Sequence, residues 1–253
     1  MMRLKTKKDI AALRVSGRIL AETLHSLAKE CKRGVSLEYL DDLARERIRV
    51  QGAKPAFLGY QPAWADEPYP AAICASLNEQ IVHGLPSAYV MRDGDVVKLD
   101  LGVDYRGYFT DAAITVAVGK IPARSARLIV ATKKALMAGI RAARPGNRLG
   151  DVGYAIARAI EGAGFRIVNG LTGHGVGFAP HEDPEVLNYG ERGTGLEIKP
   201  GLVIAIEPMA SAGTPEAREN PDGSFSTADG SVAAHFEHTV YVGEKGPEIL
   251  TSA

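Results

Sequence analysis

The chain has 253 residues, 45% of them hydrophobic and 24% charged, so it is long enough to bury a sizeable core. Its 30 basic and 30 acidic side chains give no net charge, which argues against bulk attraction to nucleic acid or to an anionic membrane. The two cysteines lie far apart and no apolar run reaches about 18 residues, so we expect a protein of the reducing cytoplasm without a membrane span.

Four helices are expected from capping residues and apolar periodicity. Thr6 and Asp9 have the spacing of a capping box, and the apolar residues that follow recur on one helical face. Ser36 is a candidate N-cap for a second helix that runs to Gly52. The third and fourth helices cover about residues 123–143 and 149–162, and both end at turns that contain glycine.

Four strands are expected from β-branched and apolar residues, over 96–103, 108–118, 202–208 and 235–242. A shift of the numbering by 112 aligns Gly34 with Gly146 and Leu37 with Leu149. Each half then contains a long helix, a turn with glycine, a second helix and β-structure. We therefore expect one α+β domain over residues 1–253, with two related halves that contribute carboxylates to a central site.

A pair of aspartates is expected to share one face of a hairpin in the segment KLDLGVDYRGYFTDAA. A turn over Asp104–Gly107, centred between Tyr105 and Arg106, would place Asp100 directly opposite Asp111. The alternative is that one aspartate faces solvent beside the turn. Because the flanking residues are apolar, unpaired carboxylates here would be costly and would need a proton or a cation.

Two glutamates and a histidine extend this acidic group. Glu207 ends the apolar strand LVIAIEP, and Glu237 lies in FEHTVYV; neither strand holds a lysine or arginine to pair with them, although a buried salt bridge stays open for each. His174 lies in GHGVGFAPHEDP (173–184), which has neither helical nor strand periodicity. Two divalent ions, with a total charge of about +4, would balance the negative charge of four carboxylates. Oxygen ligands with one imidazole are typical of two-metal hydrolytic sites.

Five motifs, in this order and spacing, are similar to those of type I methionine aminopeptidases of the creatinase-like family. They are VHGLP (82–86), KLDLGVDYRGYFTD (98–111), GHGVG…HEDP (173–184), IEPM (206–209) and FEHT (236–239). The resemblance covers nearly the whole chain. It implies the pita-bread fold, in which two pseudo-symmetric halves form a curved, mostly antiparallel sheet covered by helices. It also implies removal of the initiator methionine from newly made proteins, with small second residues favoured.

The same resemblance implies a role for each matching side chain. The implied metal ligands are Asp100, Asp111, His174, Glu207 and Glu237, of which Asp111 and Glu237 bridge two divalent ions (Co, Mn, Fe or Zn). Glu207 would also move the proton, His181 would stabilise the substrate's carbonyl oxygen, and His83 would contact the scissile amide. A monovalent cation near Asn78 is a further implication. His235 shares Glu237's side of the strand by alternation, but no role is assigned to it.

An apolar pocket for a methionine side chain is also implied, although each of its residues could equally be plain core. The expected lining is Tyr60, Tyr69, Cys74 and Met209, with Phe57 as a further candidate. The sequence departs from the family pattern at Pro180, where an aromatic residue is common and Phe178 lies two positions earlier. It also departs in the longer loop 62–70 and at GSF (223–225), where a tryptophan is often found.

Two other functions compete with this interpretation. A proline-specific aminopeptidase or dipeptidase on the same fold is disfavoured by VHGLP and by the absence of the N-terminal domain usual in those enzymes. A binding module that has lost its ligands is disfavoured by the intact ligand set. The 26 positions between His181 and Glu207 leave no room for the helical subdomain of type II enzymes. By resemblance, the partners are N-termini of peptides and nascent proteins and also the ribosome, and the protein is a monomer.

Overall fold

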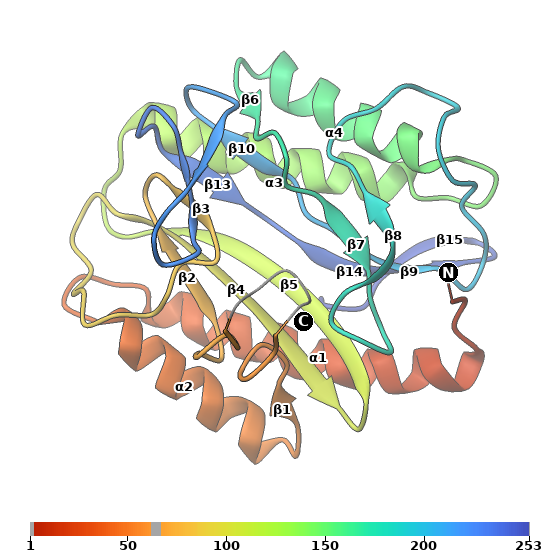
Figure 1. Ribbon diagram of the computed structural model, residues 1–253, viewed down its shortest axis with the longest axis horizontal. Coiled ribbons are helices and arrows are strands. Elements are labelled where there is room, and N and C mark those ends of the chain that lie inside the picture. Colours follow the sequence, from red (N-terminus) through yellow and green to blue (C-terminus); the bar gives the residue numbers. More distant parts are fainter. Residues whose placement is uncertain (1–2, 62–66, 253) are drawn as a thin grey trace.

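The computed structural model describes residues 3–61 and 67–252, so part of the loop 62–70 lies outside the described residues. The helices of the described chain are α1 (Lys7–Glu30), α2 (Leu37–Val50), α3 (Ala123–Ala142) and α4 (Leu149–Gly162). Figure 1 shows α1 and α2 on one side of the molecule and α3 and α4 on the other, with the strands between them. The layered arrangement of helices on sheets confirms the α+β class.

The strands are short apart from one long hairpin. They are β1 (Lys54–Pro55), β2 (Cys74–Leu77), β3 (Gln80–Val82), β4 (Val96–Tyr105), β5 (Tyr108–Ala117), β6 (Arg166–Ile167), β7 (Gly173–Gly175), β8 (Glu182–Val186), β9 (Val203–Ile206), β10 (Met209–Ser211), β11 (Ala217–Glu219), β12 (Phe225–Thr227), β13 (Ala233–His235), β14 (His238–Gly243) and β15 (Gly246–Ile249). They form sheets with the strand orders β1-β4-β2, where β5 pairs with β4, and β13-β10-β6, β11-β12-β3 and β15-β14-β9-β7-β8. All pairings among the described strands are antiparallel, in line with the mostly antiparallel sheet that was expected.

Both expected N-caps are present. The Thr6 hydroxyl accepts the Asp9 N–H, and the Asp9 carboxylate accepts the Thr6 N–H at 2.8 Å, which completes the capping box of α1. The Ser36 hydroxyl accepts the Tyr39 N–H at 3.2 Å and caps α2 in the same way. These bonds satisfy backbone donors that the first turn of a helix leaves free.

The offset of 112 positions is a property of the fold as well as of the sequence. Helices α2 and α4 begin at Leu37 and Leu149 and end at Val50 and Gly162, so both ends differ by 112. Strands β1 and β6, which follow these helices, begin at Lys54 and Arg166 with the same offset. The offset therefore relates a complete helix and its following strand in the two halves.

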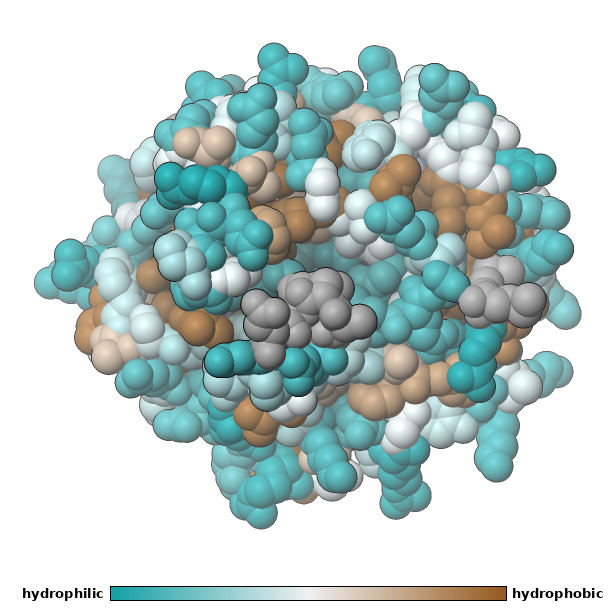
Figure 2. Space-filling model, in the orientation of Figure 1, coloured by the Kyte–Doolittle hydropathy of each residue, from teal (hydrophilic) through white to brown (hydrophobic). Residues whose placement is uncertain are grey.

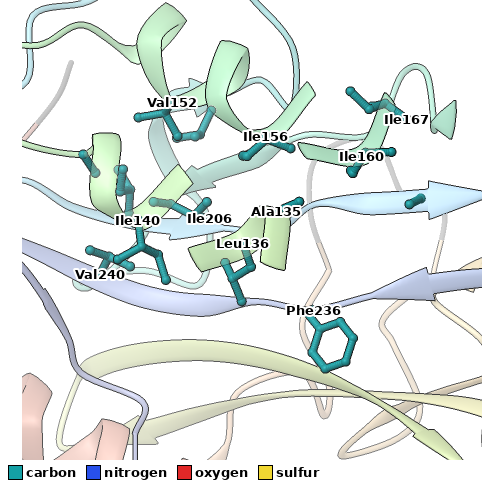
Figure 3. Close-up of a cluster of buried hydrophobic side chains, with 14 of the residues drawn as sticks. Ala135, Leu136, Ile140, Val152, Ile156, Ile160, Ile167, Ile206, Phe236 and Val240 are labelled. Atoms are coloured by element: carbon teal, nitrogen blue, oxygen red, sulfur yellow. The ribbon is translucent and has the colours of Figure 1, made fainter. Parts of the chain in front are cut away.

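Each half has its own hydrophobic core between helices and strands. In the second half, α3 and α4 pack on β9 and β14, and Figure 3 shows Ile140, Ile156, Ile206 and Val240 converging there. Close packing requires Gly139, because a Cβ at that position would lie 2.8 Å from Ile156 Cγ1. In the first half, α1 and α2 cover β2 and β4.

Strand β5 joins the two halves. Ile114 packs against both cores, and the backbones of Ala113 and Glu237 exchange two hydrogen bonds of 2.9 and 3.4 Å. The Thr239 hydroxyl lies at 2.8 Å from both the N–H and the carbonyl oxygen of Asp111. The acidic residues of the two halves are therefore held beside one another by backbone contacts.

Candidate metal centre

The aspartates of the β4–β5 hairpin share a face, but their predicted pairing is wrong by two residues. Asp100 lies opposite Ala113, and Asp111 lies opposite Gly102. The two carboxylates are diagonal neighbours on the same side of the sheet rather than direct partners, which keeps them within reach of a common cation.

The geometry of the turn explains this shift in register. Arg106 and Gly107 form a two-residue turn, with Tyr105 paired to Tyr108, so the hairpin centre lies one residue later than expected. Both turn residues have positive φ, 58° for Arg106 and 83° for Gly107. Asp104 Oδ1 accepts the Gly107 N–H at 2.7 Å and stabilises this tight turn.

The two glutamates lie where paired strands break. The expected strand 202–208 is interrupted between β9 and β10 at Glu207, and the expected strand 235–242 is interrupted between β13 and β14 at Glu237. Because β9 pairs with β14 and β10 with β13, both interruptions fall at the same level. Pro208 has no N–H to continue the first ladder. Both carboxylates therefore lie at the level where the strand pairing changes.

His174 lies on a strand, contrary to the irregular structure expected for 173–184. Strand β7 runs between β9 and β8. A Cβ on Gly173 would lie 2.4 Å from the Ala205 carbonyl oxygen, and a Cβ on Gly175 would lie 2.2 Å from that of Asp183. The glycines therefore allow β7 to fit between its neighbours, which obscures the usual strand periodicity.

The predicted ligands converge beneath a hollow face of the molecule. His174 Nε2 lies 3.4 Å from Glu207 Oε1 and 3.9 Å from Asp111 Oδ2. Two clusters of donor atoms, each within 4.8 Å, are formed by Asp111, His174 and Glu237 and by Glu207, His235 and Glu237. They share Glu237. Figure 2 shows the surface hollowed near its centre, over the strands labelled β5, β7 and β14 in Figure 1.

The carboxylates of this centre are far from their ordinary protonation behaviour. Burial, followed by repulsion from neighbouring carboxylates, raises the pKa of Asp100, Glu207 and Glu237 well above the usual range. Burial raises the pKa of Asp111 to about 7. Four buried acids this close together require an additional positive charge if all are to ionise.

The side chains present fit divalent cations. Asp100 Oδ1, Asp111 Oδ1 and Glu237 Oε1 are buried without a hydrogen-bond partner in the part of the chain that the structure describes. Among the described residues, no lysine or arginine forms an ion pair with these acids. Carboxylate oxygens with one or two imidazole nitrogens suit Mn, Fe, Co and Zn.

The two histidines expected beside the substrate flank this centre. The His181 ring stacks on Tyr60 at 5.4 Å, and its Nδ1 lies 3.2 Å from the Tyr60 hydroxyl. Its centroid lies 4.2 Å from that of His174. Burial lowers the pKa of His181, while burial and then the charge of His181 lower that of His83 to about 4. Neither residue belongs to the donor clusters among the described residues, in keeping with non-ligand roles.

The expected pocket residues lie close to the acidic centre. Cys74 is buried on β2 directly opposite Asp100, and the Tyr69 hydroxyl donates to the carbonyl oxygens of Ile73 and Gly84. The pairing of β10 with β13 places Met209 beside His235. Phe57 is buried and meets Tyr69 edge to face at 6.4 Å. Their contact with a substrate stays a prediction.

Two of the departures from the family pattern have structural counterparts. Phe225, from the segment GSF that stands where the family often has a tryptophan, packs edge-on against His83 with a centroid distance of 5.9 Å. Its role beside this histidine had no signal in the sequence. Phe178 instead packs with Tyr108 and under the Arg3 guanidinium, so compensation for Pro180 stays untested.

The carbonyl oxygen of Asn78, where a monovalent cation was predicted, has a lysine beside it. Lys98 is fully buried, and its ammonium donates to the Asn78 carbonyl oxygen at 2.8 Å. Burial lowers the pKa of Lys98 to about 7. The monovalent cation is untested, and sequence reasoning overlooked this buried amine, which competes for the same carbonyl oxygen.

Known proteins resemble the chain along its whole length. Residues 11–244 match metallopeptidase family M24. A methionine aminopeptidase from Aquifex aeolicus is 46% identical and covers 98% of both chains. The crystal structure of a methionine aminopeptidase from Thermotoga maritima has a TM-score of 0.96 at 39% identity and covers 100% of both chains. A Pyrococcus furiosus prolidase, at 23% identity and a TM-score of 0.79, shares the fold over 65% of its own length. The chain belongs to metallopeptidase family M24.

Proposed function

We propose that this protein is a methionine aminopeptidase that removes the N-terminal methionine from peptides and newly made proteins by metal-dependent hydrolysis. The observation that carries the proposal is the buried cluster of carboxylates and imidazole in a chain closely similar, end to end, to enzymes of that name. A small second residue is expected in the preferred substrates.

Two divalent ions are part of the proposal. Their ligands would be Asp100, Asp111, His174, Glu207 and Glu237, with Asp111 and Glu237 shared. Two ions of charge +2 would balance four ionised carboxylates, and the unpartnered buried oxygens support this assignment. When bound, such ions polarise a carbonyl group and lower the pKa of a bound water.

The chain's own residues would position the substrate and move the proton. Glu207 would accept a proton and return it to the leaving amine. Tyr60 would donate to His181 Nδ1, which leaves the proton on Nε2 to donate to the substrate's carbonyl oxygen as charge develops there. His83 would contact the scissile amide. Burial lowers the pKa of both His83 and His181, so both imidazoles are neutral and each retains one N–H donor.

The side chain of the substrate's methionine would lie against Tyr69, Cys74 and Met209. Two of these side chains carry sulfur and one is aromatic, a combination that favours contact with a thioether. Burial raises the pKa of Cys74 well above its usual value, so its thiol stays protonated and is suited to packing rather than to nucleophilic attack.

The cellular setting follows from the substrate. Among the described residues, no helix is both long and apolar enough to cross a membrane. We place the protein in the cytoplasm as a monomer, where the N-termini of nascent chains would be its substrates and the ribosome a further partner.

Substrate preference is the test of this function. Apo-protein reconstituted separately with Co, Mn, Fe and Zn is given Met-Ala-Ser, Met peptides with bulkier second residues, and an Xaa-Pro peptide. Release of methionine from Met-Ala-Ser, faster than from peptides with bulky second residues, is expected. Preferential cleavage of the Xaa-Pro peptide would instead support the proline-specific alternative, whose structural likeness concerns the fold alone.

A further inference from the structure

His235 has a fixed backbone and a buried side chain. It lies on β13, is 1% exposed, and pairs with Met209 of β10. The Thr115 hydroxyl donates to the His235 carbonyl oxygen at 2.6 Å and accepts its N–H at 2.9 Å. A backbone held from both sides in this way gives the imidazole a defined direction.

The imidazole lacks a hydrogen-bond partner but faces a carboxylate. Neither ring nitrogen has a hydrogen bond among the described residues. The Nε2 atom lies 3.5 Å from Glu207 Oε2, while the other oxygen of the same carboxylate, Oε1, lies 3.4 Å from His174 Nε2. Glu207 is therefore flanked by two imidazoles, one at each oxygen.

The carboxylate beside His235 favours a donor at Nε2. The carboxylate oxygen Oε2 of Glu207 faces Nε2. A lone pair on Nε2 would repel Oε2, whereas an N–H attracts it. The separation of 3.5 Å is longer than a usual N–H···O bond of about 2.7–3.2 Å, and such contacts commonly tighten when a site is filled.

We propose that His235 is a positioning residue whose Nε2–H donates to Glu207 Oε2 and holds Oε1 toward His174 and the metal ions. This inference rests on the proposed function, in which Glu207 is both a metal ligand and the proton carrier. Carboxylate ligands are commonly fixed by such outer hydrogen bonds. Without this donor, the Glu207 carboxylate could rotate, and Oε1 would leave its position beside His174 Nε2.

The test compares His235→Leu, which removes the donor, with His235→Gln, which retains an N–H donor. The matched control is His238→Gln, since the His238 Nδ1 atom contacts the Thr251 hydroxyl. Each purified full-length apo-protein is titrated with Co(II) and followed by its visible absorption. Turnover of Met-Ala-Ser is then measured at saturating metal.

We expect His235→Leu to lose about 10- to 100-fold in Co(II) affinity and to lower kcat more than it changes KM. His235→Gln should recover most of both losses, and His238→Gln should match the wild type. A wild-type Co(II) affinity in His235→Leu would overturn the inference. Equal losses in the Leu and Gln variants would overturn it too, since they would show that imidazole packing matters rather than the donor.

A second measurement needs no variant and covers the case in which His235→Leu does not fold. The ¹⁵N-histidine spectrum of the wild-type zinc form should show His235 with its proton on Nε2, and a proton on Nδ1 would refute the assignment. The proposed function has a separate readout. If the wild type binds metal but cleaves no Met-Ala-Ser, the function fails while the affinity comparison still tests His235.

Discussion

Two histidines seven positions apart face different partners. His174 points toward Glu207 and Asp111, whereas His181 stacks on Tyr60. We predict that His174→Ala weakens metal binding, because a nitrogen ligand is lost. His181→Ala should keep the metal affinity but lower kcat by about 10²-fold, as expected for loss of an oxyanion donor. Calorimetric metal titration and peptide kinetics on both variants separate the roles, and a metal affinity lost equally in both would contradict them.

Glu207→Gln tests the proton carrier. The amide has nearly the same shape but cannot accept the proton, so kcat should fall by at least about 10²-fold at saturating metal. The apo-variant should unfold at a temperature equal to or above that of the wild type, because one acid is removed from a group that repels it. Full turnover by the metal-loaded variant, measured with Met-Ala-Ser, would exclude this role.

At the residue scale, the sequence was informative where side-chain chemistry recurs in motifs. Asp111, Glu207 and Glu237 stand out because acids are rare in apolar strands, and the structure brings them together. His235 was placed near the site by strand alternation, yet its contact with Glu207 depends on how β13 meets β10. Phe225 had no comparable signal, since its packing on His83 joins segments about 140 positions apart.

At the element scale, helix caps were predicted correctly from neighbouring residues, whereas strand pairing between distant segments was predicted only in part. The caps at Thr6 and Ser36 depend on neighbours within three residues, and both formed as expected. The breaks at Glu207 and Glu237 were missed, because periodicity within one segment does not show that β9 pairs with β14 while β10 pairs with β13. The one-residue shift of the hairpin centre likewise depended on the turn that Arg106 could adopt.

Gly175→Ala should destabilise the strand that carries His174. The added methyl group would meet the Asp183 backbone at 2.2 Å, and overpacking of this kind costs about 1–3 kcal/mol. Gly162→Ala at the end of α4 is the matched control. Its methyl group meets open space, and the free energy of unfolding should stay unchanged or rise by about 0.4–1 kcal/mol. Urea unfolding measures both, and an unaltered midpoint for Gly175→Ala would contradict the packing argument.

Lys98 should make the fold independent of potassium and sodium. Its ammonium already lies at the Asn78 carbonyl oxygen, so replacing K⁺ by choline at constant ionic strength should leave the wild-type unfolding temperature unchanged. Lys98→Met removes that charge and leaves the Asn78 carbonyl with the Ala233 N–H. The variant should unfold at a lower temperature that K⁺ partly restores. A wild type that itself responds to K⁺ would support a bound monovalent cation instead.

At the scale of the whole molecule, the acidic centre lies where the two halves meet. Asp100 and Asp111 come from the first half and His174, Glu207 and Glu237 from the second, with β5 bonded across the boundary. Each half has a separate hydrophobic core, so contacts between the halves depend strongly on this central region. Ions bound by residues of both halves would therefore stabilise the molecule as a unit.

Removal of divalent ions should lower the unfolding temperature of the whole protein in one cooperative step. Ions at about 100 times their Kd stabilise a fold by roughly 2.7 kcal/mol, which corresponds to a shift of about 5–10 °C for a chain of this size. Differential scanning calorimetry with and without a chelator measures this shift, and added Mn or Co should reverse it. Asp111→Asn is the control, because losing a shared ligand should shrink the difference between the two conditions. If the chelated and the metal-loaded wild type unfold at the same temperature, metal binding does not stabilise the contact between the two halves.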